Sequence, residues 1–389
     1  MVVSIVTIAV SQSTIFQTSN AASALIVPTY FPTIQAAINA ASSSNMIKVL
    51  PGIYTEQLTI GKNLILVGSG AKSTIIKAPA GVQPSEILEG KANIIELSNN
   101  AKVTMKGFTI AGPDGSNCDN LFGVTIADGA ALKLDSSAVK GCTIRAITVG
   151  FCGLCFPTGP QVGHATIINT EITNYRENGI QSGGDGSTIS VSNSKVIAAN
   201  APEIPGQVGI LFGQGVRAAI DHNKISGNIC GHPACGPDFF NQIQSAAILA
   251  LQAIPDSTIF QNEVTNNDVG IGVFSDDRCC KISQNKLEDN QFFGMSFLDG
   301  VYTSLQDKIS GGNIGVAAIG ISTNTKVTLV NDKITSTTAP TQELSCCGGT
   351  AEIVTVPPGG FKVSVSQANV KSSQVHDLME KKFKKLMEP

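Results

Sequence analysis

Three kinds of residue are scarce in this 389-residue chain. There is no tryptophan, there are only four tyrosines, and charged side chains make up 14% of the residues, against roughly 25% in an ordinary globular protein. The lack of tryptophan leaves few side chains that stack on sugar rings. The formal net charge of −3 provides no basic face, so nucleic acid is not expected as a partner.

The chain is instead rich in glycine and in residues typical of strands and turns. Its 39 glycines, together with many valines, isoleucines, threonines, serines and asparagines, favour short strands joined by turns. No segment after the first residues is long and apolar enough to span a bilayer. The composition therefore predicts an all-β protein.

Residues 1–24 have features of a secretory signal peptide. The apolar run "MVVSIVTIAV" is followed by "NAASA", in which Ala22 and Ala24 form a small-x-small cleavage site. The first charged side chain is Lys48, so the basic start of a signal is absent, and an apolar first strand is the alternative. We favour export, which predicts a secreted or cell-surface protein without a transmembrane segment once the signal is removed.

Close pairs among the ten cysteines also favour export. Cys152 and Cys155 lie in "CGLC", and Cys230 and Cys235 lie in "CGHPAC". A zinc site would need a second CxxC or a histidine pair, and only His232 is nearby. Close pairs in an exported chain usually cross-link loops, so we predict disulfides here, with a metal site as the alternative.

Seven segments repeat one pattern: an aliphatic residue, two residues, a small polar residue, one residue and a second aliphatic residue. Their last aliphatic residues are 22 to 39 residues apart, and the two longest intervals contain insertions: Ile172, Val196, Ile225, Val264, Leu287, Ile309 and Ile334. A βαβ unit takes about 30 residues, so the shorter copies hold only two or three strands. Such units bury their apolar faces by stacking, which predicts a parallel β-helix.

Two polar columns run through the repeats. One contains Thr170, Ser194, Asn223, Asn262, Asn285, Asp307 and Asp332, and the other contains Asn169, Asn193, His222, Gln261, Gln284, Gln306 and Asn331. Stacked amides hydrogen-bond from coil to coil and satisfy polar groups at a turn. We therefore predict a structural ladder rather than a catalytic site, with His222 as a member.

Both ends of the solenoid have a candidate helix. "PTIQAAINAASS" places Ile34, Ala37, Ile38 and Ala41 on one face, as expected for an N-terminal cap. Residues 371–389 carry an apolar stripe made by Val375, Leu378, Met379, Phe383, Leu386 and Met387. This C-terminal amphipathic helix is predicted to be a second cap, or else a dimer or surface-docking helix. The β-helix domain is assigned to residues 25–370.

"TIQAAINAA", "VLPGIYTEQLTI" and "LILVGSGAKSTII" resemble the opening of the right-handed parallel β-helix proteins of the pectate-lyase-like superfamily. The resemblance extends over roughly residues 28 to 340 and implies the fold rather than an activity. The superfamily includes pectin and alginate lyases, epimerases, polygalacturonases, pectinesterases and non-enzymatic surface proteins. Their catalytic motifs are absent or incomplete here, and "NTE" at Asn169 and "DDR" at Asp276 are partial matches only.

Insertions after Val196 and Ile225 protrude from one corner of the predicted solenoid. The second insertion holds Phe239 and Phe240, and insertions on one face of a repeat protein often form its binding face. We predict that both phenylalanines bind substrate. The alternative is a disulfide-linked loop that covers the edge of the core.

Acidic residues mark another corner. Asp185 lies in "SGGDG", Asp276, Asp277 and Arg278 lie in "FSDDRCC", and Asp299 lies in "FLDG". Asp276 and Asp299 are one coil apart, about 4.8 Å, so with Asp277 they form a candidate for weak calcium binding. These three aspartates and Arg278 are also the catalytic candidates, and Asp185 is a candidate for binding substrate. The alternative is ordinary turn chemistry, since aspartate beside glycine favours turns.

Two functions remain open. The first is an exported β-helix protein that binds or organises cell-surface or extracellular polysaccharide without catalysis. The second is a lyase, epimerase or glycoside hydrolase that acts on a uronic-acid-containing glycan at the acidic corner. The missing motifs and the scarcity of ionisable groups favour the first.

Overall fold

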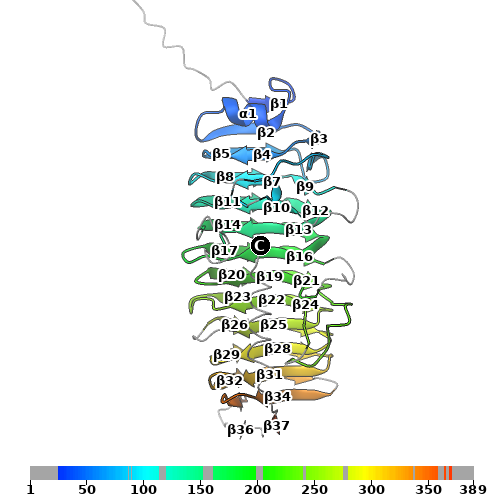
Figure 1. The fold of residues 1–389 in the computed structure, drawn as a ribbon, viewed down its shortest axis with the longest axis vertical. Coiled ribbons are helices and arrows are strands. Elements are labelled where there is room, and N and C mark those ends of the chain that lie inside the picture. Colours follow the sequence, from blue (N-terminus) through cyan, green and yellow to red (C-terminus); the bar gives the residue numbers. More distant parts are fainter. Residues whose placement is uncertain are drawn as a thin grey trace, which may run out of the picture.

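The computed structural model describes residues 25–85, 87–88, 90–113, 120–151, 161–198, 205–239, 242–274, 279–335, 338–357, 363–364 and 368–369. In these residues one short helix lies near the N-terminal end, and the strands before and after it stack into a long solenoid (Figure 1). Each coil adds one strand to each of three sheets, which we call A, B and C. The predicted right-handed parallel β-helix is confirmed. The predicted signal peptide and the predicted C-terminal helix lie outside the described residues.

Sheet A opens each coil. Its strands pair in parallel, except that β35 and β36 are antiparallel. They are β1 (Leu25–Val27), β2 (Asn45–Val49), β5 (Leu64–Gly68), β8 (Lys102–Lys106), β11 (Ala130–Asp135), β14 (Gly163–Ile168), β17 (Thr188–Ser192), β20 (Arg217–Asp221), β23 (Thr258–Phe260), β26 (Lys281–Ser283), β29 (Val301–Leu305), β32 (Thr325–Val330), β35 (Ala351–Val356) and β36 (Val363–Ser364).

Sheet B follows after a tight turn and consists of short parallel strands. They are β3 (Gly52–Thr55), β6 (Thr74–Lys77), β9 (Thr109–Ala111), β12 (Ala138–Lys140), β15 (Glu171–Thr173), β18 (Lys195–Ile197), β21 (Lys224–Ser226), β24 (Glu263–Thr265), β27 (Lys286–Glu288), β30 (Lys308–Ser310) and β33 (Lys333–Thr335).

Sheet C closes each coil, and its central strands are buried on both faces. Its strands are β4 (Leu58–Ile60), β7 (Ala92–Leu97), β10 (Leu121–Ile126), β13 (Thr143–Val149), β16 (Tyr175–Ser182), β19 (Val208–Gly213), β22 (Ala246–Leu251), β25 (Val269–Phe274), β28 (Phe293–Leu298), β31 (Ile314–Gly320), β34 (Ala339–Ser345) and β37 (Ala368–Asn369). Sheets A and B instead alternate buried and exposed residues, so only sheet C is covered on its outer face.

The N-terminal helix α1 (Ile34–Ala40) covers the first coil. Ile34, Ala37 and Ile38 are buried, as predicted, and Thr33 caps the helix by accepting a hydrogen bond from the backbone N–H of Ala36. The carboxylate of Glu56 accepts two further N–H groups of the first turn at 2.9 Å each. The helix therefore closes the open end of the core.

The turn between sheets A and B carries both polar columns. Residues of the second column have φ between 49° and 59°, a left-handed conformation in which asparagine is enriched: Asn169, Asn193, His222, Gln261, Gln284, Gln306 and Asn331. Gln261 donates to Gln284, and Gln284 to Gln306, at 2.8 and 3.3 Å. His222 instead contacts Asp221 in its own coil at 2.9 Å, so it occupies the column without extending the ladder.

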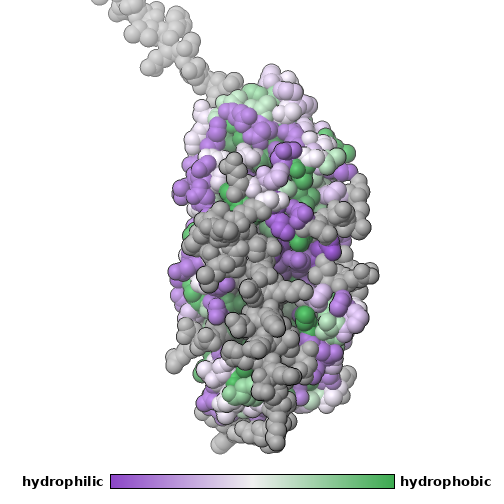
Figure 2. Space-filling view, in the orientation of Figure 1, coloured by the Kyte–Doolittle hydropathy of each residue, from purple (hydrophilic) through white to green (hydrophobic). Residues whose placement is uncertain are grey.

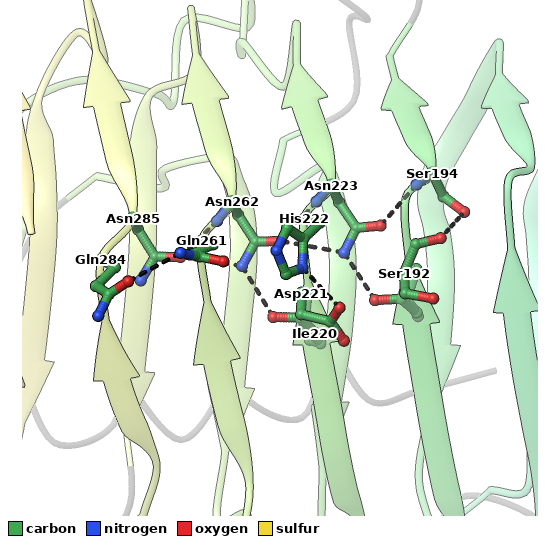
Figure 3. Close-up of polar contacts among 11 residues, drawn as sticks. Ser192, Ser194, Ile220, Asp221, His222, Asn223, Gln261, Asn262, Gln284 and Asn285 are labelled. Atoms are coloured by element: carbon green, nitrogen blue, oxygen red, sulfur yellow. Dashed lines mark hydrogen bonds and ion pairs between the residues drawn. The ribbon is translucent and has the colours of Figure 1, made fainter.

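The other column forms the predicted ladder inside the turn (Figure 3). Each asparagine amide donates both to the oxygen of the next rung and to a backbone carbonyl of the preceding coil. Asn262 donates to Asn285 at 3.0 Å and to the carbonyl of Ile220 at 2.9 Å, and Asn223 donates to Asn262 at 3.1 Å. The ladder satisfies buried backbone groups at every rung.

The exposed surface of the described residues is mixed in character. Figure 2 shows hydrophilic and hydrophobic side chains interspersed on the face in view. No helix among the described residues is long and apolar enough to cross a membrane.

Candidate functional site

The predicted acidic corner is described only in part. Asp276, Asp277 and Arg278 lie outside the described residues. Asp299 follows β28 and is 9% exposed. Its carboxylate accepts hydrogen bonds of 2.8 to 3.2 Å from the backbone N–H groups of Ile321, Ser322 and Thr323. Asp299 thus holds the turn of the next coil, and that role uses most of its acceptor capacity.

Of the other predicted ligand-binding residues, Asp185 and Phe239 are described, and these two lie apart. Asp185 is exposed in the turn between β16 and β17. Phe239 is buried over the middle of sheet C, where its ring packs edge-on against Phe274 and Phe293 at 5.7 and 6.2 Å between centroids. Phe240, Cys152 and Cys155 lie outside the described residues. No group of three or more potential metal ligands gathers in the part of the chain that the structure describes.

The loop that carries Phe239 is anchored at both ends. Cys230 and Cys235 are joined by a disulfide. One carboxylate oxygen of Asp268 accepts the backbone N–H of Cys230 at 3.1 Å and that of Ser245 at 2.9 Å. Burial raises the pKa of Asp268 to about 6, against these two hydrogen bonds, which lower it. These contacts make the loop a fixed cover on sheet C.

A polar area that the sequence did not reveal lies on the outer face of sheet C. The parallel register places Glu96, Thr125, Thr148 and Gln181 at one position of β7, β10, β13 and β16. We call these four residues the polar row. Successive members are about 4.8 Å apart along the solenoid axis. The row is therefore a straight series of hydrogen-bonding side chains.

A buried cation lies beside the polar row. Arg145 on β13 is 2% exposed, its Nη2 lies 3.6 Å from Oε2 of Glu177, and its guanidinium lies over the ring of Phe122 at 5.2 Å. Burial lowers the pKa of Arg145, and Glu177 acts in the opposite direction. Arginine keeps its charge in such an environment, so the pair is a charged hydrogen-bonding centre.

Several polar atoms in this area have no hydrogen-bond partner. They are Oγ1 of Thr125 and Thr148 and Oδ1 of Asn178, all buried. The amide of Asn178 donates to Gln181 at 2.8 Å, which orients its free oxygen. Each buried unpaired group costs about 1–3 kcal/mol, and native proteins contain few of them. Three on three adjacent strands form a cluster of unsatisfied acceptors on the covered outer face of sheet C.

Glu96, at one end of the row, is already engaged. Its Oε2 accepts hydrogen bonds from Ser85 and from Asn93, the latter at 2.8 Å. One feature of the sequence could have indicated this area: Arg145 interrupts the apolar run "TIRAITV". Without the register, however, nothing in the sequence showed that Thr125, Thr148 and Gln181 share one line with each other.

Comparisons with known proteins agree with the fold. A model of the right-handed β-helix region matches residues 160–338. A search of curated proteins finds no match.

Solved structures with the same architecture share little sequence with this chain. A Geobacillus virus E2 protein, ORF18, is 15% identical with a TM-score of 0.39, and the match covers 83% of this chain and 57% of that one. The periplasmic alginate epimerase AlgG is 11% identical, with a TM-score of 0.47 and coverages of 78% and 66%. The mannuronan C-5 epimerase AlgE6 A-module of Azotobacter vinelandii is 13% identical, with a TM-score of 0.44 and coverages of 87% and 94%. These likenesses concern the fold alone.

Proposed function

Because this chain is a right-handed parallel β-helix repeat protein, we propose that it binds a polysaccharide along its solenoid axis, on the polar row of sheet C. The observation that carries the proposal is the set of buried, unpaired hydroxyl and amide oxygens at Thr125, Thr148 and Asn178. Because these atoms are covered in the free protein, the proposed ligand displaces the cover of this face and supplies the donors that these oxygens lack.

The geometry of the row supports a chain-like ligand. Its members repeat at about 4.8 Å, a spacing comparable with the length of one sugar ring. A glycan lying along the axis meets an equivalent polar side chain at each sugar. The ring of Phe122 and the aliphatic side chain of Ile144 belong to an apolar cluster on the same face. Sugar recognition combines polar contacts of this kind with apolar surface.

The arrangement of acidic groups favours binding over hydrolysis. Glu96 on β7 and Glu177 on β16 are three coils apart, about 14 Å by the spacing of parallel strands. Inverting glycosidases place their two carboxyl groups about 6.5–9.5 Å apart, and retaining ones about 5 Å. The proposed function is therefore glycan binding without catalysis. We also propose export, which the disulfides of the described residues support.

Replacing Thr125 and Thr148 together by valine tests the function. Valine keeps the shape of threonine but removes the hydroxyl, so the affinity for a bound glycan should fall about 10- to 100-fold for two lost hydrogen bonds. The free protein should become slightly more stable, because two buried unpaired groups are gone. Calorimetry against alginate, polygalacturonate and a neutral β-glucan measures the affinity, and thermal unfolding measures the stability.

Thr303→Val is the matched control, because Thr303 is exposed on the outer face of sheet A and should leave affinity unchanged. The proposal is wrong if no glycan binds, or if the double variant binds as well as the wild type. Appearance of unsaturated or reducing ends during the titration would show the enzymatic alternative instead.

A further inference from the structure

Beyond the polar row, the outer face of sheet C is mostly apolar from β19 to β34, with Ser296 and Gln342 as polar members. Each of these six strands contributes outward side chains to one cluster, including Leu211, Leu249, Val269, Phe293, Ala317 and Leu344. We call this area the apolar strip. It runs along the solenoid axis for five strand spacings, or about 24 Å.

The apolar strip is covered although it faces away from the core. The six side chains named above are at most 7% exposed, whereas outward side chains on sheet A are exposed. Among the described members of this cluster, only Phe239 comes from a loop that folds over the face, and it packs near β25 and β28.

The last described strand brings the chain to the end of this strip. β37 pairs with β34 in sheet C, with Ala368 opposite Leu344. Residues 371–389 follow directly. As a helix, these 19 residues would be about 28 Å long at 1.5 Å per residue, which matches the length of the strip.

We propose that residues 371–389 form a helix that runs back along the apolar strip toward β19. Its apolar stripe, which includes Leu378, Phe383 and Leu386, packs on the strip, and its lysines at 381, 384 and 385 face solvent. Amphipathic helices bind apolar surfaces in this way. The inference does not depend on the proposed function.

A photo-crosslinker in the full-length protein distinguishes this arrangement from an end cap. Residue 383 lies 13 residues beyond residue 370, or about 20 Å, which is about four strand spacings from β37 and thus near β25. With p-benzoylphenylalanine in place of Phe383, we expect crosslinks within one molecule to peptides that contain β22, β25 or β28. The same group in place of Lys384 should crosslink at several-fold lower yield.

Crosslinks from position 383 to β33 or β35 would place the segment over the end of the solenoid. Crosslinks between two copies would identify a dimer helix. Either result, or equal yields at positions 383 and 384, or no crosslink at position 383, would overturn the proposal.

Discussion

Replacing Asn262 by leucine should lower the free energy of unfolding by about 3–5 kcal/mol. Asn262 is 1% exposed. Its oxygen accepts the backbone N–H of Asn223 at 3.0 Å and the amide of Asn223 at 3.1 Å, and its own amide donates to the carbonyl of Ile220. Leucine has a similar volume but no polar atoms, so several buried groups lose a partner at once. Urea unfolding at neutral pH measures the change.

Gln261→Asn provides the comparison. Gln261 precedes Asn262 in the same turn but is exposed and has a φ of 52°, which asparagine tolerates well. The free energy of unfolding of this variant should lie within about 0.5 kcal/mol of the wild-type value. If Asn262→Leu is no less stable than Gln261→Asn, the buried ladder does not stabilise the solenoid.

Replacing Asp332 by asparagine should stabilise the protein above neutral pH. Burial, with the charge of Asp307 as a further cause, raises the pKa of Asp332 to about 7, and burial also raises the pKa of Asp307. Both residues continue the asparagine ladder, where Asp332 accepts the backbone N–H of Asp307 at 2.6 Å. A carboxylate cannot supply the amide donor that the asparagine rungs supply.

The direction of the pH effect follows from this raised pKa. Below about pH 4, Asp332 is protonated in both the folded and the unfolded chain. Between about pH 4 and 7 only the unfolded chain loses the proton, so stability falls as pH rises. Above pH 7 the folded chain carries the full penalty, on the order of 2 kcal/mol once partial exposure is taken into account.

The free energy of unfolding of Asp332→Asn should therefore be higher than that of the wild type by about 2 kcal/mol at pH 8. Near pH 4 the two values should be equal. Urea unfolding at both pH values measures the difference. Asp289→Asn makes the same charge change at an exposed residue with a left-handed φ of 53°. It should show no such pH-dependent gain. If the free energies of unfolding of Asp332→Asn and the wild type differ by a constant amount from pH 4 to 8, the pKa of Asp332 is not raised in the folded protein.

The fold could be predicted from the sequence because each coil repeats the same physical requirements. The turn from sheet A to sheet B needs a left-handed residue followed by a buried polar one, and the pairs Gln261–Asn262 and Gln284–Asn285 meet both needs. Outside the two insertions these pairs recur every 22 to 25 residues, which made the repeat visible. The face that the N-terminal helix buries followed in the same way from its apolar spacing.

A second ladder was missed because its residues follow no short motif. Asn228, Asn267 and Asn290 lie in the turns between sheets B and C. Asn228 donates to the side-chain oxygen of Asn267, and Asn267 to that of Asn290, both at 2.9 Å. Asn228 also accepts the hydroxyl of the buried Tyr175 at 2.7 Å. An insertion separates the first two residues by 39 positions, so only the register of the coils brings them into line.

The candidate site could not be located from sequence for a related reason. The predicted corner relied on aspartates beside glycine, but a turn needs the same residues, and Asp299 serves a turn. The polar row depends on which strand residues face outward. In sheet C both faces are buried, so Thr125 and Thr148 stand in apolar strands without the alternation that marks a face.

The structure of a complex between this protein and a bound oligosaccharide tests the central claim most directly. The oligosaccharide should be chosen from whichever polymer binds in the titration. We expect consecutive sugars to lie along the solenoid axis over sheet C, with hydroxyl groups donating to Thr125, Thr148 and Asn178. A glycan bound at the turns that hold Asp185 or Asp299, or anywhere away from the polar row, would contradict the account.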